Sequence, residues 1–410
     1  MSRLREMIQE LCPDGVEYRK LKEIFDTRNG YTPSKSNDSY WENGTIPWFR
    51  MEDIRENGHI LSDSIQHVNS KAIKGDLFPA NSIIVATSAT VGEHALITVP
   101  SLANQRFTYL MLKHEFSGAF DIKFLFYYCY NLDLWCLSHL NQGSFPSVDM
   151  KQFAQFEIPV PPLPIQNEIV KLLDNFTELT AELTAELTAE LQLRKKQYNF
   201  YRENLLKFPS NTKCYKTGDI FNIQNGYTPS KKQSSYWQHG TIPWYRMEDI
   251  RANGRILYDA IQHVHYSGVK GNLYPEKSIL MATTATIGEY ALLMTSSLSN
   301  QQMTNFSIKK EFKELLDVKF AFYYFHVFAE WCKKNANQSG GMPIITTAKL
   351  KTFSFPIPPL EVQQKIVSTL DRFDALCNDL TQGLPAEIAA RKKQYEYYRD
   401  KLLTFRRKEA

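Results

Sequence analysis

Side chains suited to reading nucleic acid occur in this 410-residue chain as two matching sets. The segment GTIPWFRMEDIR, which starts at Gly44, recurs as GTIPWYRMEDIR from Gly240. A guanidinium group makes bidentate contacts to guanine or grips a phosphate, and these segments carry four arginines: Arg50, Arg55, Arg246 and Arg251. The repeated spacing predicts two similar DNA-contacting surfaces. The alternative, an arginine that is only solvated, stays open for each of them.

Amides and hydroxyls follow the same repeat. The side chains of Asn and Gln match the hydrogen-bonding edge of adenine, although they also bond local backbone. The amides in question are Asn104, Gln105, Asn300 and Gln301. The segment NGYTPSK, at Asn29 and again at Asn225, adds groups that hold phosphates. Those residues are Tyr31, Thr32, Lys35, Tyr227, Thr228, Lys231 and Lys232.

The motifs of common catalytic and nucleotide sites are absent from the sequence. It contains no GxGxxG, no GxxxxGK[ST] and no [ND]PP[YF], which argues against a dinucleotide site, a P-loop and an amino-methyltransferase site. The nine histidines form no HExxH or HxxH pattern, and the six cysteines show no zinc-site spacing. We therefore expect no catalytic residue and no metal site on this chain.

The totals favour a cytoplasmic protein. No apolar run approaches the length of a membrane span, and the charged, amphipathic start MSRLREMIQELCPDG is unlike a signal peptide. The cysteine spacing predicts reduced thiols and no disulfides. The formal net charge of +4 permits nucleic-acid binding without demanding it.

The elements that must position these residues are written twice. Residues 29–110 align without a gap with residues 225–306, and about three positions in five match. All six tryptophans fall in pairs 196 positions apart: Trp41 with Trp237, Trp48 with Trp244, and Trp135 with Trp331. A period of this length indicates domain duplication and not a solenoid. We expect a globular domain (1–157), a long helix (158–208), a second globular domain (209–354) and a second long helix (355–410).

The segment from Pro159 to Phe208 is predicted to form one long helix, because after its Pro-rich start it contains no Pro or Gly. Apolar residues recur in it at spacings of three and four, which predicts a stripe that packs against one other helix. They are Ile169, Leu172, Leu173, Phe176, Leu179, Leu183, Leu187 and Leu191. The tetrapeptide TAEL occurs three times in tandem, and each copy adds about 6 Å and about 40°. The repeat is either a ruler or a plain helical spacer.

The second long helix starts as PIPPLEVQQKIVSTLDRF at Pro356 and should pair with the first, antiparallel, across a pseudo-two-fold axis. This pairing predicts a globular domain at each end of the rod. Gly383 and Pro385 should break or kink the second helix.

Each globular copy is predicted to mix strands and helices. Short β-like runs start at Ser82, Ala95 and Phe107, between turn signals. An aromatic helix follows, FDIKFLFYYCYNLDLWC, repeated as LDVKFAFYYFHVFAEWC. We interpret it as core, since aromatic stripes at helical spacing are usually buried.

Taken together, the chain resembles the specificity subunit of a type I restriction-modification enzyme. The resemblance covers essentially the whole chain and lies in the GYTPS…YW..G.IPW…D and P[VI]PPL..Q..I..LD.F patterns and the TAEL copies. It implies an α+β or α/β fold: two target-recognition domains joined by long antiparallel coiled-coil helices, which serve as ruler and docking surface. The implied partners are double-stranded DNA, two modification subunits that bind S-adenosylmethionine, and restriction subunits that use ATP and Mg. It implies no cofactor and no catalytic residue on this chain, and no membrane.

For such a domain the GYTPS, IPW and NQ elements are expected to build scaffold, and base readout is expected from the residues after IPW and in the TSAT and TTAT turns. These are Phe49, Arg50, Met51, Glu52, Thr87, Ser88 and Thr90, and Tyr245, Arg246, Met247, Glu248, Thr283, Thr284 and Thr286. Two rivals remain: a stand-alone bipartite DNA-binding regulator or architectural protein, and a helical scaffold that binds only protein.

Overall fold

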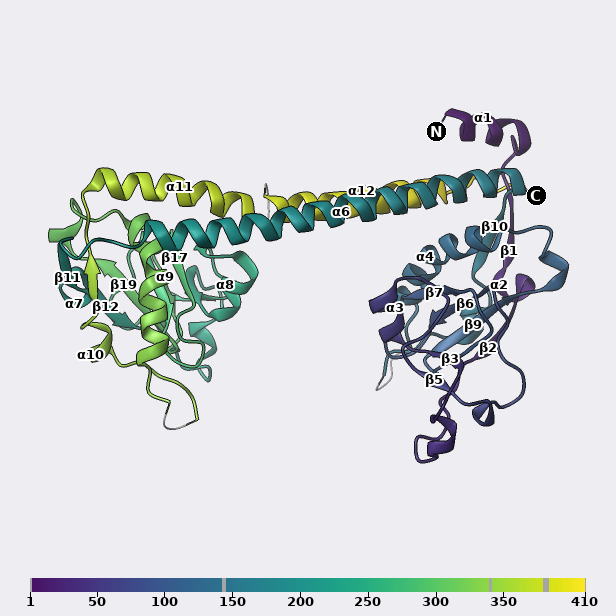
Figure 1. Ribbon diagram of the computed structural model, residues 1–410, viewed down its shortest axis with the longest axis horizontal. Helices are drawn as coiled ribbons and strands as arrows, with labels where there is room; N and C mark the ends of the chain where they lie inside the picture. The colour runs from purple at the N-terminus through teal and green to yellow at the C-terminus, as the bar shows by residue number, and fades with distance from the viewer. Residues whose placement is uncertain (1, 142–144, 339–340, 379–382, 410) are drawn as a thin grey trace. The chain divides into compact units, whose positions relative to one another are not determined.

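The computed structural model describes residues 2–141, 145–338, 341–378 and 383–409 (Figure 1). The chain divides into two compact units. Unit 1 comprises Met1–Leu183 and Ala390–Ala410, and unit 2 comprises Thr184–Ala389. Both units mix α and β structure and repeat the same element order, so the predicted fold class is confirmed. The predicted four-segment division describes the sequence repeat; the compact units run across it, because each includes parts of the long helices.

Unit 1 contains ten strands among its described residues. They are β1 (Glu17–Lys20), β2 (Phe25–Asn29), β3 (Ile46–Phe49), β4 (Ile60–Leu61), β5 (His67–Val68), β6 (Ser82–Ala86), β7 (His94–Ile97), β8 (Leu102–Ala103), β9 (Phe107–Leu112) and β10 (Glu157–Val160). Its helices are α1 (Ser2–Leu11), α2 (Leu21–Ile24), α3 (Met51–Asn57), α4 (Ile122–Ser138), α5 (Met150–Phe153), the first part of α6 (Leu163–Leu205) and the last part of α12 (Leu384–Leu402).

Unit 2 repeats these elements. Its strands are β11 (Cys214–Lys216), β12 (Phe221–Asn225), β13 (Ile242–Tyr245), β14 (Ile256–Leu257), β15 (His263–Val264), β16 (Ser278–Ala282), β17 (Tyr290–Leu293), β18 (Leu298–Ser299), β19 (Met303–Ile308) and β20 (Ser354–Pro356). Its helices are α7 (Thr217–Ile220), α8 (Met247–Asn253), α9 (Val318–Asn335), α10 (Thr347–Leu350), α11 (Leu360–Asn378), the last part of α6 and the start of α12.

A five-stranded mixed sheet is the centre of each globular module. In unit 1 its order is β2-β9-β6-β7-β4, antiparallel except for the parallel pair β4·β7, and unit 2 has the order β12-β19-β16-β17-β14. Alternate residues of β6 face opposite ways: Ile83 packs with α4, and Ile84 packs with β3 and α3. Both faces of the sheet are therefore covered. The strands predicted at Ser82, Ala95 and Phe107 are β6, β7 and β9.

The aromatic segment of each copy is a buried helix, as predicted. Phe124 on α4 and Phe320 on α9 are both 0% exposed. Each helix starts at an aspartate, Asp121 or Asp317, whose carboxylate accepts two backbone N–H groups of the first turn. Most of the aromatic side chains of both helices form core.

A buried glutamine fixes the start of each long helix to its module. The amide nitrogen of Gln166 donates to the carbonyls of Ala119 (2.8 Å) and Pro161 (2.7 Å), while its oxygen accepts from the Asp121 N–H (2.9 Å). Gln363 makes the equivalent three bonds in unit 2. Each amide is fully buried, so every one of these bonds replaces a lost bond to water.

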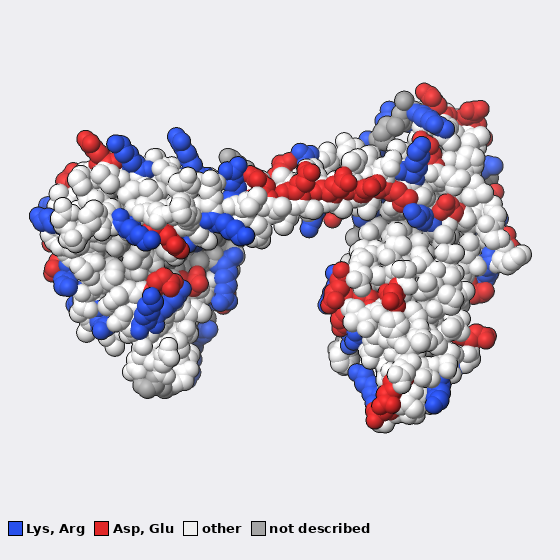
Figure 2. All heavy atoms as spheres, viewed as in Figure 1, with Lys and Arg blue, Asp and Glu red and all other residues white. Residues whose placement is uncertain are grey.

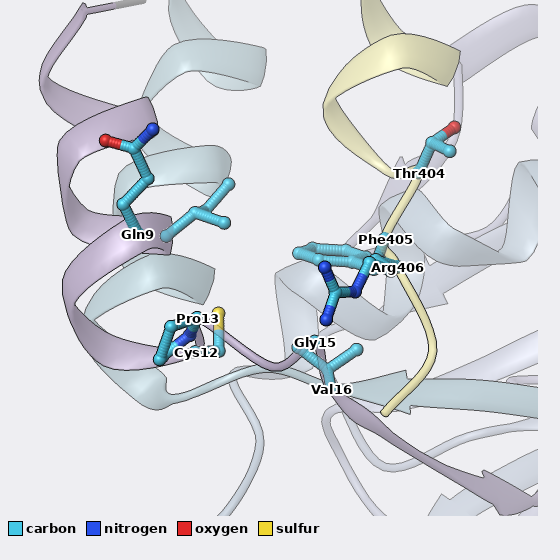
Figure 3. Close-up of a pocket in the computed structure, with 9 residues that line it drawn as sticks. Gln9, Cys12, Pro13, Gly15, Val16, Thr404, Phe405 and Arg406 are labelled. Atoms are coloured by element: carbon cyan, nitrogen blue, oxygen red, sulfur yellow. The ribbon is translucent and has the colours of Figure 1, made fainter. Parts of the chain in front are cut away.

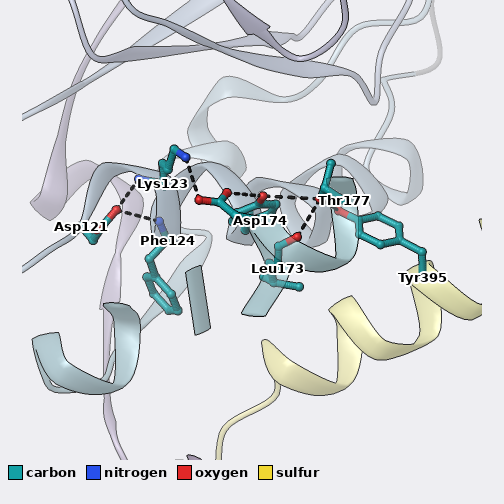
Figure 4. Close-up of polar contacts among 8 residues, drawn as sticks. Asp121, Lys123, Phe124, Leu173, Asp174, Thr177 and Tyr395 are labelled. Carbon is teal, nitrogen blue, oxygen red and sulfur yellow. Dashed lines mark hydrogen bonds and ion pairs between the residues drawn. The ribbon is translucent and has the colours of Figure 1, made fainter. Parts of the chain in front are cut away.

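An aspartate about two turns further along each long helix also binds the helix to its module (Figure 4). Asp174 on α6 accepts from the ammonium of Lys123 and the hydroxyl of Tyr127, both at 2.7 Å. Burial raises the pKa of Tyr127 well above its usual value, so the phenol stays protonated and donates. In unit 2 Asp371 on α11 accepts from Lys319 and Tyr323, again at 2.7 Å.

Within unit 1 the long helices run antiparallel. The hydroxyls of Thr177 on α6 and Tyr395 on α12 lie 3.0 Å apart (Figure 4), and the rings of Phe176 and Tyr398 lie 6.0 Å apart. As the residue number increases along α6, the number of the facing residue on α12 decreases.

Unit 2 shows the same direction of pairing between α6 and α11. The rings of Tyr198 and Tyr201 lie 6.2 and 5.2 Å from that of Phe373. Lys195, earlier on α6, is close enough to Cys377, later on α11, to act on its pKa. The predicted antiparallel pairing is confirmed inside each unit, and the predicted placement of the two modules at the ends of a rod stays a prediction.

One member of the predicted apolar stripe is not packed. Ile169 and Leu173 are fully buried, but Leu179 is 60% exposed. The register set by Thr177 and Tyr395 brings the Arg391–Lys393 stretch of α12 to this level, where the sequence has no apolar residue to continue the stripe.

The predicted break in the second long helix lies partly at residues 379–382, which are outside the described residues. Next to them Gly383 is a bend and α12 starts at Leu384, so Pro385 sits in its first turn, where its missing N–H costs nothing. None of the described helices has the length and apolarity that a membrane crossing needs.

The chain's two ends meet in unit 1. The Val16 N–H donates to the Arg406 carbonyl, and the Lys408 N–H donates to the Val16 carbonyl, both at 2.9 Å. A hollow of about 310 Å³ lies beside this contact, between α1 and the segment after α12 (Figure 3). Gly15 has φ +97°, and a side chain there would meet the Arg406 carbonyl at 2.6 Å, so the contact requires glycine.

At one position of the helix–module junction, unit 2 has a histidine where unit 1 has a tyrosine: His326 on α9 against Tyr130 on α4. Burial, reinforced by the charge of Arg202, lowers the pKa of His326 to about 4. In the unfolded chain the pKa is about 6.5. The unfolded state therefore binds more protons between these values, so this stability is fully present above about pH 6.5 and is lost as the pH falls toward 4.

His326→Tyr should remove this acid sensitivity. We expect the wild-type chain to lose about 1–2 kcal/mol of unfolding free energy between pH 7.5 and 4.5 through this group, after allowing for partial solvent screening. Denaturant unfolding at the two pH values measures it. The control His265→Gln, an exposed histidine of the same unit, should keep the wild-type loss; an equal loss in His326→Tyr would contradict the assignment.

Candidate nucleic-acid interface

Three loops of unit 1 are tied together by backbone hydrogen bonds. The Gly30 N–H donates to the Phe107 carbonyl (2.9 Å), the Tyr31 N–H to the Ala103 carbonyl (2.8 Å), and the Asn104 N–H to the Phe49 carbonyl (3.0 Å). A side chain at Gly30 would lie 2.4 Å from the carbonyl oxygens of Ala103 and Asn104, so only glycine allows this approach. The structure thus brings the GYTPSK, IPWFR and NQ segments into one surface.

Unit 2 builds the same surface. The Gly226 N–H donates to the Met303 carbonyl (2.8 Å), and the Asn300 N–H donates to the Tyr245 carbonyl (3.1 Å). A side chain at Gly226 would lie 2.0 Å from the Asn300 carbonyl oxygen. The two sets of residues matched in the sequence are therefore assembled twice, once in each unit.

The arginine after each IPW segment is positioned by its helix. Arg50 precedes α3, and buried Asp53 accepts from the N–H groups of Arg50 and Ile65, both at 2.6 Å. Its guanidinium lies 5.7 Å from the Trp48 ring, and its side chain is 27% exposed. Arg246 repeats this arrangement with Asp249 and Trp244. These bonds hold the backbone of each arginine, while its guanidinium lies near a glutamate, Glu52 at 4.0 Å or Glu248 at 3.0 Å.

The amide of each NQ segment is fixed by the GYTPSK loop. The Thr32 hydroxyl donates to the Gln105 amide oxygen, and the Thr228 hydroxyl donates to that of Gln301. The amide oxygen keeps a second lone pair and the amide nitrogen keeps its donors, so both remain able to meet an adenine edge. Asn104 and Asn300 bond local backbone instead, the alternative left open for them.

Several candidate readers lie in the core. Phe49 and Tyr245 are 0% exposed and Met51 is 4% exposed, because their side chains pack into the hydrophobic cores of the modules. Thr87 and Thr283 are buried, with their hydroxyls 2.9 and 2.8 Å from those of Thr108 and Thr304. These five side chains have no surface with which to touch a base, so we assign them to the scaffold.

The hydroxyls of Tyr31 and Tyr227 are also used inside the protein. The Tyr31 oxygen accepts from the Lys74 N–H (2.8 Å) and donates to the Ala72 carbonyl (3.2 Å), and Tyr227 bonds the Lys270 N–H and the Gly268 carbonyl. The expected phosphate contact through these hydroxyls is therefore replaced by loop anchoring.

The remaining candidates are accessible. Exposed or half-exposed side chains on the two surfaces are Thr32, Lys35, Arg50, Glu52, Arg55, Ser88 and Gln105 in unit 1, and Thr228, Lys231, Arg246, Met247, Glu248, Arg251, Thr284, Thr286 and Gln301 in unit 2. Thr90 is half-buried as a residue, but its hydroxyl oxygen is buried and is therefore not placed to read a base. The TSAT and TTAT turns are tight: Ala89 and Ala285 have φ +66° and +65°, a conformation that non-glycine residues adopt at a cost. Thr87 links its turn to the NQ loop, since its N–H donates to the Arg106 carbonyl (3.0 Å).

Sequence reasoning missed Arg106 and Gln302. Arg106 is exposed directly beside Gln105, and Gln302 is half-exposed at the equivalent place in unit 2. The sequence does mark these residues, since they occupy the first position after the matched NQ pair, where the two copies differ. The two surfaces therefore differ here in the group that they present, a guanidinium in unit 1 and an amide in unit 2.

The exposed side of α6 has the opposite charge character. Glu178, Glu182, Glu186 and Glu190 recur at every fourth position, on one face of the helix. Figure 2 shows acidic side chains gathered in a row along α6. Such a face repels phosphates, so the basic and amide-bearing loops are the better nucleic-acid surface.

We found no catalytic or metal constellation among the described residues. Within them, no group of three or more His, Cys, Asp or Glu side chains is placed to hold a metal ion. His94 and Asp133 form a 2.6 Å pair that could suggest acid–base chemistry, but both are buried. Unit 2 has Tyr290 and Ala329 at these positions, so we assign the pair to the core of unit 1.

Comparison with known proteins places this geometry in a family. A family model described as "Type I restriction modification DNA specificity domain" matches residues 13–193 and again residues 209–390. The chain therefore belongs to this family and carries its domain twice.

Individual relatives agree. The chain is 41% identical over 395 residues to the type I restriction enzyme EcoprrI specificity subunit of Escherichia coli, covering 91% of this chain and 92% of that one. It is 34% identical over 409 residues to a putative type I restriction enzyme specificity subunit of Haemophilus influenzae, covering 95% and 96%.

Solved structures share the fold. A chain from a structure titled for complex assembly and conformational transition of the type I R-M system matches with a TM-score of 0.64 at 17% identity, covering 95% of this chain and 97% of that chain. The HsdS subunit from Thermoanaerobacter tengcongensis matches with a TM-score of 0.54 at 16% identity, covering 96% and 97%.

Proposed function

We propose that this chain is the DNA-recognition subunit of a type I restriction-modification enzyme, and that each unit reads one half of a bipartite target. The observation that carries the proposal is the duplicated surface: two sets of hydrogen-bonded loops present a held arginine and a held amide in the same geometry. Base-edge contacts of this kind specify sequence, while lysines and further arginines at the rim contact phosphate.

The chemistry of modification and cleavage belongs, on this proposal, to partner subunits. The chain itself contributes recognition and no catalytic group; S-adenosylmethionine, ATP and Mg are bound by two modification subunits and by restriction subunits. The long helices offer a matching pair of docking anchors. Phe200 on α6 is 64% exposed and Tyr397 on α12 is 60% exposed, at equivalent places of the repeated LRKKQYNFYR and ARKKQYEYYR segments. Exposed aromatic residues of this kind are typical of interface anchors.

Mapping of methylated adenines in a host that expresses this chain with its modification subunits tests the proposal. Because the two surfaces share most of their residues, we expect a bipartite, nearly palindromic target that contains adenine in each half. Arg106 and Gln302 should mark the position where the halves differ. Unrelated half-sites, or no sequence-specific methylation, would contradict the proposal.

Arg50→Ala should relax discrimination at one base pair of one half-site. The loss of a bidentate contact is worth about 1–3 kcal/mol of specificity. Competition binding with single-base variants of the mapped target measures it. The matched control Arg246→Ala should have the same effect in the other half-site. Uniform weakening on all sequences would instead identify Arg50 as a phosphate contact.

Deletion of one TAEL copy, residues 184–187, should shorten the spacer of the target by one or two base pairs. The deletion removes about 6 Å of helix, against a rise of about 3.4 Å per base pair. The half-sites should stay the same, since no residue of either surface changes. Methylation mapping of the variant is the measurement, and altered half-sites with an unchanged spacer would rule out the ruler.

A further inference from the structure

A large apolar side chain stands exposed beside the TSAT turn of unit 1 and beside the TTAT turn of unit 2. Phe145 is 77% exposed and Met342 is 62% exposed. They occupy equivalent places in the repeat, each immediately before a proline. A single exposed apolar residue needs no explanation, but the same exposure at the same place of both units does.

Both side chains are tied to the reading surface by backbone hydrogen bonds. In unit 1 the Ala89 N–H donates to the Pro146 carbonyl (2.8 Å), and the Val148 N–H donates to the Thr87 carbonyl (2.9 Å). These bonds lie on the C-terminal side of Phe145 and hold it next to Ser88 and Thr90. The apolar side chain is thereby presented within the surface proposed to read bases.

Unit 2 uses the same attachment. The Ala285 N–H donates to the Pro343 carbonyl (2.9 Å), and the Ile345 N–H donates to the Thr283 carbonyl (3.0 Å). The proline after each apolar residue biases that residue to an extended backbone, which reduces the entropy lost when the side chain is gripped. The arrangement is built in advance of binding.

Both units expose an apolar side chain beside the turn, but the apolar residues exposed on α4 of unit 1 are not repeated in unit 2. Unit 1 also exposes Leu134 and Leu137 on α4, but the equivalent residues of unit 2 are Glu330 and Lys333, which form a 2.8 Å ion pair. A shared apolar docking face is therefore absent from the described residues of unit 2. What the units share is one exposed apolar side chain beside a turn whose backbone is hydrogen-bonded to the NQ loop. That combination suits a base stack, where an apolar side chain enters between bases whose edges are hydrogen-bonded.

We propose that Phe145 and Met342 are wedges: each inserts between two base pairs of the half-site that its own unit reads and unstacks that step. The inference rests on the proposed function and extends it, since it assigns part of the target selectivity to the deformability of a step that no polar group contacts. Phe145 also stacks on a base, whereas Met342 only separates the pair. The half-site read by unit 1 should therefore be gripped more tightly at this step.

The test uses the full chain assembled with its modification subunits, and duplexes of the mapped target with 2-aminopurine at single purine positions. Wild-type binding should raise fluorescence at one step of each half-site. Phe145→Ala should abolish the rise in one half-site only, Met342→Ala in the other only, and Phe145→Ala should weaken specific binding about tenfold. Phe145→Leu should retain the fluorescence rise but lose part of the affinity, because leucine separates bases without stacking on them. Leu134→Ala, a change at an exposed apolar residue of the same unit, should change neither.

Each other outcome is decisive. A target base turned out by the modification subunits also brightens, but in every variant, so the wedge is measured as the difference between wild type and variant. A Phe145→Ala chain with unchanged fluorescence and affinity overturns the wedge, as does one that only loses modification subunits, which would make Phe145 a protein contact. If the wild-type chain prefers no duplex over unrelated DNA, the proposed function itself fails. Specific binding without a wedge-dependent signal defeats the wedge alone.

Discussion

A carboxylate on each long helix holds the structure of each unit together. Asp174 on α6 and Asp371 on α11 each accept from a lysine and a tyrosine of the aromatic helix, and a buried glutamine about two turns earlier ties the same helix start to the module. Without these bonds a module would be attached to its helix by apolar contacts alone, which resist sliding and rotation poorly because they lack direction. The polar clamp gives each module one orientation on its helix.

The reading surface depends in turn on a second constraint, the close backbone approach at Gly30 and Gly226. It lets three loops share hydrogen bonds, so arginine, amide and turn hydroxyls are fixed relative to one another and to the sheet. Both units use the same scaffold bonds, and their loops nevertheless display different side chains, among them Arg106 against Gln302 and Phe145 against Met342. A duplicated scaffold with different tips is a direct way to read two related half-sites.

The repeat, the mixed fold, the 43-residue helix α6 and the buried aromatic helices follow from the sequence, because each depends on periodicity or on identity between the copies. The sequence predicts less well which side chains face solvent. Phe49 and Tyr245 are buried because their side chains pack into the module cores, and a four-residue strand carries too little alternation to reveal that. Leu179 belongs to a regular stripe, yet α12 carries no apolar residue at that level; only the register of the two helices shows this. Arg106 and Phe145 do not follow from identity between the copies, because unit 2 has Gln302 and Met342 at these positions.

The central claim is that each unit carries its own complete reading surface. Photocrosslinking of the assembled chain to target duplexes that carry 5-iodouracil at single positions, followed by mass spectrometry of the joined peptides, tests it most directly. One half-site should crosslink to peptides that contain residues 31–35, 50–55, 88–90 and 104–106, and the other half-site to peptides that contain residues 227–231, 246–251, 284–286 and 300–302. Crosslinks from both half-sites to a single unit, or to the acidic face of α6, would contradict the account.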